Sequence, residues 1–295
     1  SDRGGRSRSG PVGLVGYGEV SWLLLFLTLG PWTQGTAQPP LVYEAPRVRT
    51  SVVVDGVLDE AAWRDAPWTT DFVDILGPAG PPPHLRTRAK IAWSDTYLFI
   101  AAELEEPDLW ATLRDHDDIV YRDDDFEVFL DPSGTGESYI EIEINAFGTI
   151  LDLFLEWPYN RGGSADLAFD VQDLQTAIRL EGTLNDPGDR DKGWAVELAI
   201  PWTALIPPER ADPTLDVPFG SPPEPGDAWR MNFSRVDWPL EIYEGSYRKK
   251  AQPTPEHPHP ESNWVWSPQG VVNMHVPERW GVVRFVDGPH NFRKR

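Results

Sequence analysis

Aromatic side chains in two loops are the residues of this sequence best suited to binding a flat ligand. The segment 262–266 carries Trp264 and Trp266 within a polar stretch, next to the amide of Asn263. Indole rings stack on apolar faces while their N–H groups still find a partner, and the chain holds 14 Trp, well above ordinary usage. We expect the two indoles to point to opposite sides, with Trp266 facing the ligand and Trp264 packed inward.

The second loop spans residues 157–161, follows a β-rich segment and ends in two glycines. Trp157, Tyr159 and Arg161 offer two aromatic surfaces and a guanidinium group. Binding residues are disproportionately found on loops, so this loop is a candidate site. The alternative is an ordinary loop with one packed Trp.

Three carboxylates, Glu127, Glu141 and Glu143, lie on the polar sides of expected strands. For Glu141 and Glu143 we favour a solvated sheet face. The alternative is that Glu127 and Glu141 flank a scissile bond as acid and base, as in glycoside hydrolases. We favour a non-catalytic role, because paired carboxylates on a strand are common without catalysis. Signatures of other enzyme classes are also missing, since the sequence contains no Gly-x-Ser-x-Gly, no His-Glu-x-x-His and no phosphate-binding glycine loop.

Two acidic clusters suggest calcium, which prefers oxygen ligands. One is the turn 185–191, and the other is the Asp-rich segment 115–125. Solvated turns without an ion are the alternative. The candidate calcium ligands are Asp123, Asp125, Asp186, Asp189 and Asp191.

The composition excludes several classes of partner. A formal net charge of −21 disfavours nucleic acids and anionic membrane surfaces, because both are bound by clustered Lys and Arg. The absence of Cys excludes disulfides, thiolate metal sites and thiol nucleophiles. Neutral ligands and cations remain.

Residues 1–37 have the order of a secretory signal peptide. Three arginines precede the apolar run 20–29, and small residues lead to Ala37. This run is too short to span a bilayer. We expect cleavage after Ala37, export to a bacterial periplasm or cell exterior with no stable membrane span, and a single domain over residues 38–295.

Hydrophobic alternation predicts an all-β fold. In the segment 139–145, three Ile alternate with polar or aromatic residues, which is the two-residue period of a half-buried strand. One short helix is expected over residues 60–66, before Pro67. We therefore predict a two-sheet antiparallel β-sandwich with one short N-terminal helix and further strands at 97–104, 126–131, 149–155, 174–180, 194–200, 229–235 and 280–285.

Five short segments carry more information together than any of them does alone. They are DGVLDEAAW at 55–63, DDFEVFLD at 124–131, GWAVELAIPW at 193–202, NFSR at 232–235 and PERWG at 277–281. In this order they resemble the family 9 carbohydrate-binding modules and the related DOMON-like sandwiches. The resemblance implies a jelly-roll or DOMON-like sandwich of two antiparallel sheets, non-catalytic binding of a saccharide or polysaccharide, and structural calcium.

The resemblance also suggests which residues hold the sugar. Tyr121 and Glu127 resemble in their spacing one clamp aromatic and its hydroxyl-binding carboxylate, and the loop 263–266 lies where the other clamp aromatic falls. A pyranose has apolar C–H faces and a hydroxyl rim, which match aromatic rings and polar groups. The chain departs from the family in its length and in the inserted segment 207–226, and we expect no partner catalytic domain. Its expected role is polysaccharide recognition or catabolism.

DOMON-like sandwiches also bind haem, which gives a second class of function. Met274 and His275 are ligands by type, but adjacent strand residues point to opposite faces and cannot both reach one iron. Met231 is expected in the core.

Overall fold

A computed structural model describes residues 40–205 and 220–288, so the expected signal segment 1–37 lies outside the described residues. Among the described residues, no helix is long and apolar enough to cross a membrane. The described chain is almost entirely β-structure, with the short helix α1 (Ala61–Asp65) where the sequence predicts it. The strands are β1 (Val42–Pro46), β2 (Val73–Asp74), β3 (Thr87–Trp93), β4 (Tyr97–Glu105), β5 (Asp125–Asp131), β6 (Tyr139–Asn145), β7 (Ile150–Leu155), β8 (Ala165–Asp166), β9 (Gln175–Glu181), β10 (Gly193–Pro201), β11 (Ala228–Asp237), β12 (Leu240–Tyr243), β13 (Ser246–Lys249), β14 (Ser262–Val265) and β15 (Gly281–Val286).

The larger of two packed sheets has the strand order β1-β15-β11-β5-β6-β7-β8 within the described residues. Its neighbours are antiparallel, except that β1 and β15 run parallel. The long strand β11 pairs with β15 through its first half and with β14 through its second, and β14 also pairs with β2. The predicted sandwich is confirmed, whereas the parallel pair was not predicted.

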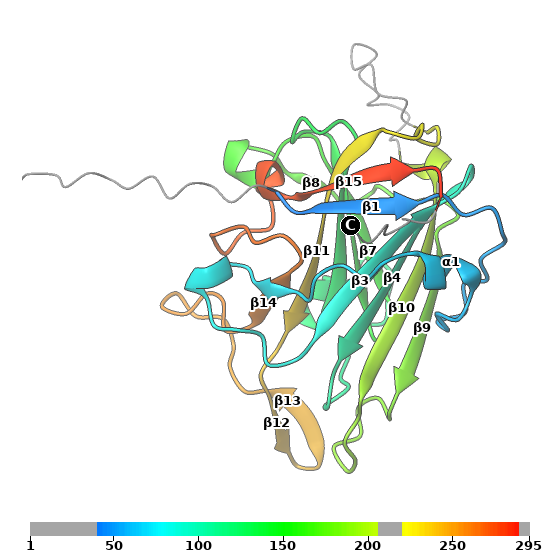
Figure 1. The fold of residues 1–295 in the computed structure, drawn as a ribbon. Coiled ribbons are helices and arrows are strands. Elements are labelled where there is room, and N and C mark those ends of the chain that lie inside the picture. The colour runs from blue at the N-terminus through cyan, green and yellow to red at the C-terminus, as the bar shows by residue number, and fades with distance from the viewer. Residues whose placement is uncertain (1–39, 206–219, 289–295) are drawn as a thin grey trace, which may run out of the picture. The chain divides into compact units, whose positions relative to one another are not determined.

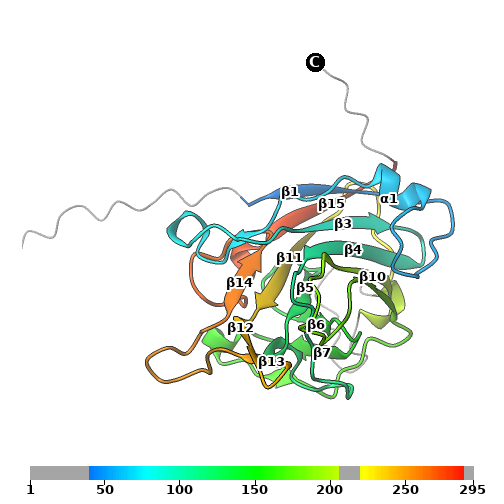
Figure 2. The same cartoon turned by 90° about the horizontal axis from the view of Figure 1, so that it is seen from below.

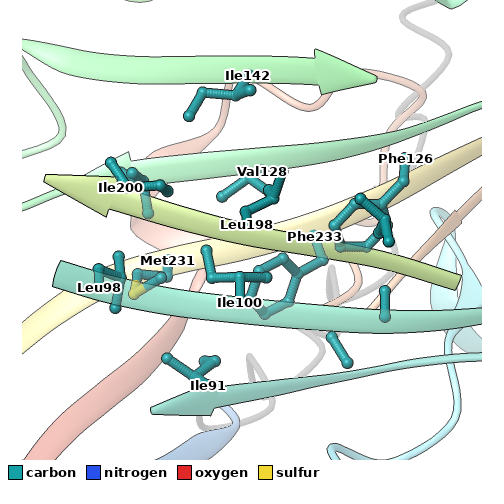
Figure 3. Packing of buried hydrophobic residues seen from close by; sticks show 14 of the residues in the cluster. Ile91, Leu98, Ile100, Phe126, Val128, Ile142, Leu198, Ile200, Met231 and Phe233 are labelled. Atoms are coloured by element: carbon teal, nitrogen blue, oxygen red, sulfur yellow. The ribbon is translucent and has the colours of Figure 1, made fainter. Parts of the chain in front are cut away.

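The smaller sheet, β3-β4-β10-β9, is antiparallel throughout and packs on the larger one (Figures 1 and 2). Figure 3 shows the core between them, where aliphatic side chains of the small sheet meet the apolar face of the large one. Alternation in β5 and β6 sends every second side chain into this layer. The labelled core residues are Ile91, Leu98, Ile100, Leu198 and Ile200 from the small sheet, and Phe126, Val128, Ile142, Met231 and Phe233 from the large sheet.

A second apolar cluster covers the outer face of the large sheet, on the side away from this core. Phe129 and Tyr139 of β5 and β6 are fully buried there beneath Trp280, whose ring lies 5.4 Å and 5.1 Å from theirs. The Trp280 Nε1–H donates to the Met274 carbonyl at 2.8 Å, which fixes the covering segment. Polar residues on this face of the sheet are therefore not freely solvated.

The motif at 55–63 is held by a buried carboxylate of the motif at 193–202. Glu197 accepts hydrogen bonds from the Trp63 Nε1–H at 2.8 Å and from the backbone N–H groups of Asp55 and Gly56 at 3.0 Å. Gly56 has φ +80° and lies against Arg179, so a side chain there would be both strained and crowded. This network docks α1 on the outer face of the small sheet.

Arg235 of the NFSR motif links the two sheets. Its buried guanidinium donates to Glu106 at 2.5 Å, to Asp237 at 2.7 Å and to the Glu105 carbonyl at 2.7 Å. Several acceptors around a buried cation offset the cost of removing it from water.

Candidate functional site

A cleft of about 810 Å³ opens on the outer face of the large sheet. Its floor comes from β5, β6 and β7, and its walls come from the turn 119–122, Tyr159 and the segments 252–263 and 272–275. In β5, Phe126 and Val128 face the main core, so Glu127 between them must face the cleft.

Glu127, Glu141 and Glu143, which we call the floor carboxylates, all line the cleft and are all buried. Glu127 of β5 lies directly opposite Glu143 of β6 in the strand register, and Glu141 is one step further along the same face. Glu143 accepts the backbone N–H of Tyr121 at 2.8 Å. The expectation that Glu141 and Glu143 lie on a solvated sheet face is wrong, because the segment that carries Met274 and Trp280 covers it.

Burial controls the protonation of this floor. It raises the pKa of Glu127 to about 7. Burial, and after it the charges of neighbouring floor carboxylates, raises the pKa of Glu141 and of Glu143 above the ordinary range. Near neutral pH the floor therefore holds both carboxylates and carboxylic acids, so it can accept and donate hydrogen bonds.

Two tyrosines offer aromatic surface in the cleft. Tyr121 is 46% exposed and Tyr159 is 44% exposed, although both line the cleft. The Tyr159 ring contacts the His275 ring edge-on, with centroids 4.4 Å apart. Partial burial raises the pKa of Tyr159 to about 12, so its hydroxyl stays neutral and can donate a hydrogen bond.

Charged and neutral polar groups complete the lining. The charged ones are Arg122, Lys249 and Glu261. The His275 Nδ1 lies 2.9 Å from the Tyr139 hydroxyl, and burial lowers the pKa of His275 to about 4, which keeps the imidazole uncharged. The amides of Asn263 and Asn273 also face the cleft. The cleft thus combines half-exposed rings, buried acids, two cationic side chains and uncharged donors and acceptors.

Trp266, which was predicted to face the ligand, is not in the cleft, whereas Trp264 packs inward as expected. Trp264 and Trp266 are each 2% exposed and belong to the main core, where Trp266 packs on Tyr43 and Phe233. Trp264 lies in the strand β14, and Trp266 follows it. The expectation of opposite orientations is wrong, because side chains two positions apart on an extended segment share a face. Of this segment, only Asn263 lines the cleft.

The three candidate residues of the loop 157–161 lie in different environments. Tyr159 enters the cleft, but Trp157 and Arg161 are not among its lining residues. Trp157 is 42% exposed elsewhere on the loop. Arg161 forms surface ion pairs with Glu278 at 3.4 Å and Glu137 at 3.9 Å.

The turn 185–191 does not have the geometry of a calcium site. The buried carboxylate of Asp191 accepts the N–H groups of Leu109 at 2.8 Å and Thr183 at 2.7 Å. Asp186 accepts the Gly188 N–H at 2.8 Å, and Asp189 is exposed. Asp186 and Asp191 therefore stabilise the loop through backbone amides, and none of the three aspartates belongs to a group of described residues that could hold a metal ion.

Asp123 is likewise a structural carboxylate. It accepts both the N–H and the hydroxyl of Thr112, at 2.6 Å and 2.7 Å, as well as the Leu113 N–H at 2.8 Å and the Asn145 amide at 3.0 Å. Four donors fill its acceptor sites, which removes it from the expected calcium ligands.

Asp125 does fit a hard cation, together with two floor carboxylates. Oxygen atoms of Asp125, Glu127 and Glu143 lie within 4.8 Å of one another, and all three residues are buried. One Asp125 oxygen accepts the Val236 N–H at 3.1 Å, whereas Oδ2 is buried without a partner among the described residues. An all-oxygen group of this kind matches the chemistry of calcium.

The potential haem ligands occupy apolar surroundings. Met231 is fully buried in the main core, as predicted. Met274 belongs to the second apolar cluster and touches the cleft beside His275. His275 is already engaged by Tyr139.

Sequence reasoning missed Glu143, Asn273 and His275 as members of the site. The alternation of β6 places Glu141 and Glu143 on one face, but nothing local signals that a distant segment covers that face. The pair Met274-His275 was considered only for haem.

The chain is similar in sequence to one known protein family. The family model described as carbohydrate family 9 binding domain-like matches residues 54–219. A search of curated proteins found none with significant similarity.

Three solved structures share the fold. A family 9 carbohydrate-binding module from Caldicellulosiruptor kristjanssonii in complex with cellotriose is 14% identical, with a TM-score of 0.51 over 83% of this chain and 94% of that one. A module of the same family and organism with glucose is 15% identical, with a TM-score of 0.52 over 85% and 99%. A proposed carbohydrate-binding protein from Bacteroides uniformis is 15% identical, with a TM-score of 0.57 over 84% and 100%. At these identities the likeness establishes the fold alone, but the family model spans more than half of the sequence, and the chain therefore belongs to the carbohydrate family 9 binding domain-like family.

Proposed function

We propose that the chain binds a neutral saccharide in the cleft and does not cleave it. The observation that carries this proposal is the meeting of two half-exposed tyrosines with buried acids and amides in one cleft. Sugar rings need both kinds of surface, because their C–H faces are apolar and their rims carry hydroxyl groups. The cleft volume of about 810 Å³ is within the range of small-ligand sites.

Each part of the lining has a role in this proposal. Tyr121 and Tyr159 supply ring surface for C–H faces. Glu127 and Glu143 accept hydrogen bonds from hydroxyl groups, and in their protonated forms they also donate. The amide of Asn263 can do both at once.

The charge of the cleft favours neutral sugars over acidic ones. Four glutamates line the cleft against two cations, Arg122 and Lys249, in a chain of net charge −21, so uronic acids and sulfated sugars should bind less well than neutral sugars. The solved relatives with cellotriose and glucose contain neutral sugars. Cellotriose and glucose are therefore the first probes, with a polygalacturonate fragment as the acidic control.

We also propose that calcium binds to Asp125, Glu127 and Glu143. The ion would balance the charge of carboxylates that are buried together, and it would keep their oxygens available as acceptors. The unpartnered Asp125 Oδ2 supports this assignment. The other aspartates expected to bind calcium are engaged by backbone amides or are exposed.

Calorimetric titration of the purified chain with these saccharides tests the function. We expect a neutral oligosaccharide to bind, and the double variant Tyr121→Ala/Tyr159→Ala to lose binding. Trp157→Ala is the matched control, since Trp157 is equally exposed but does not line the cleft. If Trp157→Ala loses binding while the double variant binds fully, the saccharide site lies outside the cleft.

Glycoside hydrolysis is the second candidate, favoured by the pKa of Glu127. A carboxyl group with a pKa of about 7 in a cleft beside Glu141 has the character of a general acid. Incubation with the bound oligosaccharide should release no reducing ends if the chain only binds. Turnover that vanishes in Glu127→Gln would instead establish the enzyme.

Export remains part of the proposal. The basic, apolar and small residues of segment 1–37 support it. N-terminal sequencing of the protein from its native host tests for cleavage after Ala37.

A further inference from the structure

Four potential metal ligands converge outside the cleft. His116, Asp117, Asp152 and Asp170 each offer one donor atom, and these atoms all lie within 4.8 Å of one another. The residues come from three separate segments: the loop before the turn at 120–122, strand β7, and the loop between β8 and β9. Asp152 is on the opposite face of β7 from Leu151 and Leu153, which line the cleft, so this is a separate site.

The separations of the three carboxylate oxygens from the His116 nitrogen are compatible with a tetrahedral site. The His116 Nε2 lies 3.0 Å from the Oδ1 of Asp170, 3.6 Å from that of Asp117 and 3.7 Å from that of Asp152. A tetrahedral zinc ion with ligands at about 2.1 Å has its donors about 3.4 Å apart. The three observed distances lie on both sides of that value, so one ion fits between the donors with small movements.

Asp152 provides independent evidence that something is bound. Its side chain is buried, and its Oδ2 accepts the N–H of Val171. Its Oδ1, the oxygen directed towards His116, is buried without a hydrogen-bond partner among the described residues. Leaving a buried acceptor unpaired is unfavourable, and a bound cation would offset that cost.

A protonated His116 does not satisfy Asp152. Its Nε2 is within hydrogen-bond distance of Asp170 only, because 3.7 Å to Asp152 exceeds that limit. A metal ion at the centre can bond to all four donors at once, whereas a single proton cannot.

We propose that His116, Asp117, Asp152 and Asp170 bind one zinc ion. The imidazole nitrogen distinguishes this site from the all-oxygen group at Asp125, since calcium prefers oxygen ligands and zinc readily takes nitrogen with carboxylates. The ion would tie together the two loops that continue to Tyr121 and Leu167, both of which line the cleft. Zinc therefore stabilises one wall of the cleft without touching its ligand.

Zinc and cobalt titrations of the purified chain, without an affinity tag, test the proposal. We expect one tight zinc equivalent per chain by calorimetry and elemental analysis, and intense visible absorption from tetrahedral cobalt in the same site. His116→Ala and Asp170→Asn should each weaken zinc binding by more than the roughly 10- to 100-fold that loss of an outer-shell partner costs. Asp170 is half-exposed at the surface, so Asp170→Asn should fold normally.

His84→Ala is the matched control. His84 has an exposed imidazole, and the carboxylate of Asp237 lies 4.0 Å from it. The variant His84→Ala should therefore leave zinc binding unchanged. The proposal is overturned if His116→Ala and Asp170→Asn bind zinc like the wild type, if cobalt shows only weak octahedral bands, or if excess calcium displaces the ion. Saccharide titration of the same variants is a separate readout, so failure here leaves the proposed sugar site standing.

Discussion

Replacing Tyr121 by alanine should weaken saccharide binding without destabilising the fold. A tyrosine buries about 150–250 Å² when fully covered, so its 46% exposed fraction leaves on the order of 80 Å² for a ligand. Covering half of that area contributes about 1 kcal/mol, and ring stacking adds about 1 kcal/mol. The sum of about 2 kcal/mol corresponds to a roughly 30-fold rise in Kd.

Trp266→Ala should show the reverse behaviour. Trp266 is buried in the main core against Gly281, so its truncation should cost about 3–5 kcal/mol of unfolding free energy. Isothermal titration and urea unfolding of both variants measure the two effects, and Tyr121→Phe, which keeps the ring, should bind nearly as the wild type does. The reasoning is refuted if Tyr121→Ala binds normally while a folded Trp266→Ala loses the saccharide.

Three further predictions concern buried carboxylates. The pKa of Glu127, about 7 when folded against an ordinary 4.5, means that the native state holds the extra proton. The free energy of unfolding should therefore fall as pH rises from about 4.5 to about 7. In Glu127→Gln this fall should be smaller by on the order of 3 kcal/mol, as measured by thermal melts at fixed ionic strength. An unchanged pH dependence in the variant would contradict this. Calcium should raise the Tm at neutral pH and Glu143→Gln should remove most of the rise, whereas a wild-type melt insensitive to a chelator would count against the ion. Glu197→Ala should cost about 3 kcal/mol in urea unfolding, because the Trp63 N–H and two backbone N–H groups lose their acceptor; a loss below 1 kcal/mol would show that water replaces it.

Local periodicity predicted these strands well, because the two faces of each strand differ clearly in hydrophobicity. The segment 139–145 alternates strictly and forms β6 with the predicted bounds. The helix predicted at 60–66 forms α1 at Ala61–Asp65, where Pro67 prevents a longer helix. β3 was not predicted, since its residues Thr87–Trp93 are buried on both faces and show little alternation.

The site was only partly predictable, because burial depends on distant segments. Tyr121, Glu127, Tyr159 and Asn263 were identified as candidates and come together in the cleft. Glu143 was dismissed because its own strand gives no sign that residues 262–280 cover it.

The sequence also could not separate carboxylates that bind backbone amides from those that could bind a cation. Asp191 and Asp125 both lie in acidic runs. Asp191 accepts two N–H groups, whereas one oxygen of Asp125 is without a partner in the described part of the chain. That difference arises from tertiary contacts, which charge patterning does not encode.

A crystal structure of the chain with its tightest-binding neutral oligosaccharide tests the central claim most directly. We predict a sugar ring in the cleft, with a C–H face against Tyr121 or Tyr159 and hydroxyl groups hydrogen-bonded to Glu127 or Glu143. A sugar bound on Trp157 or elsewhere outside the cleft, with the floor carboxylates untouched, would contradict the account.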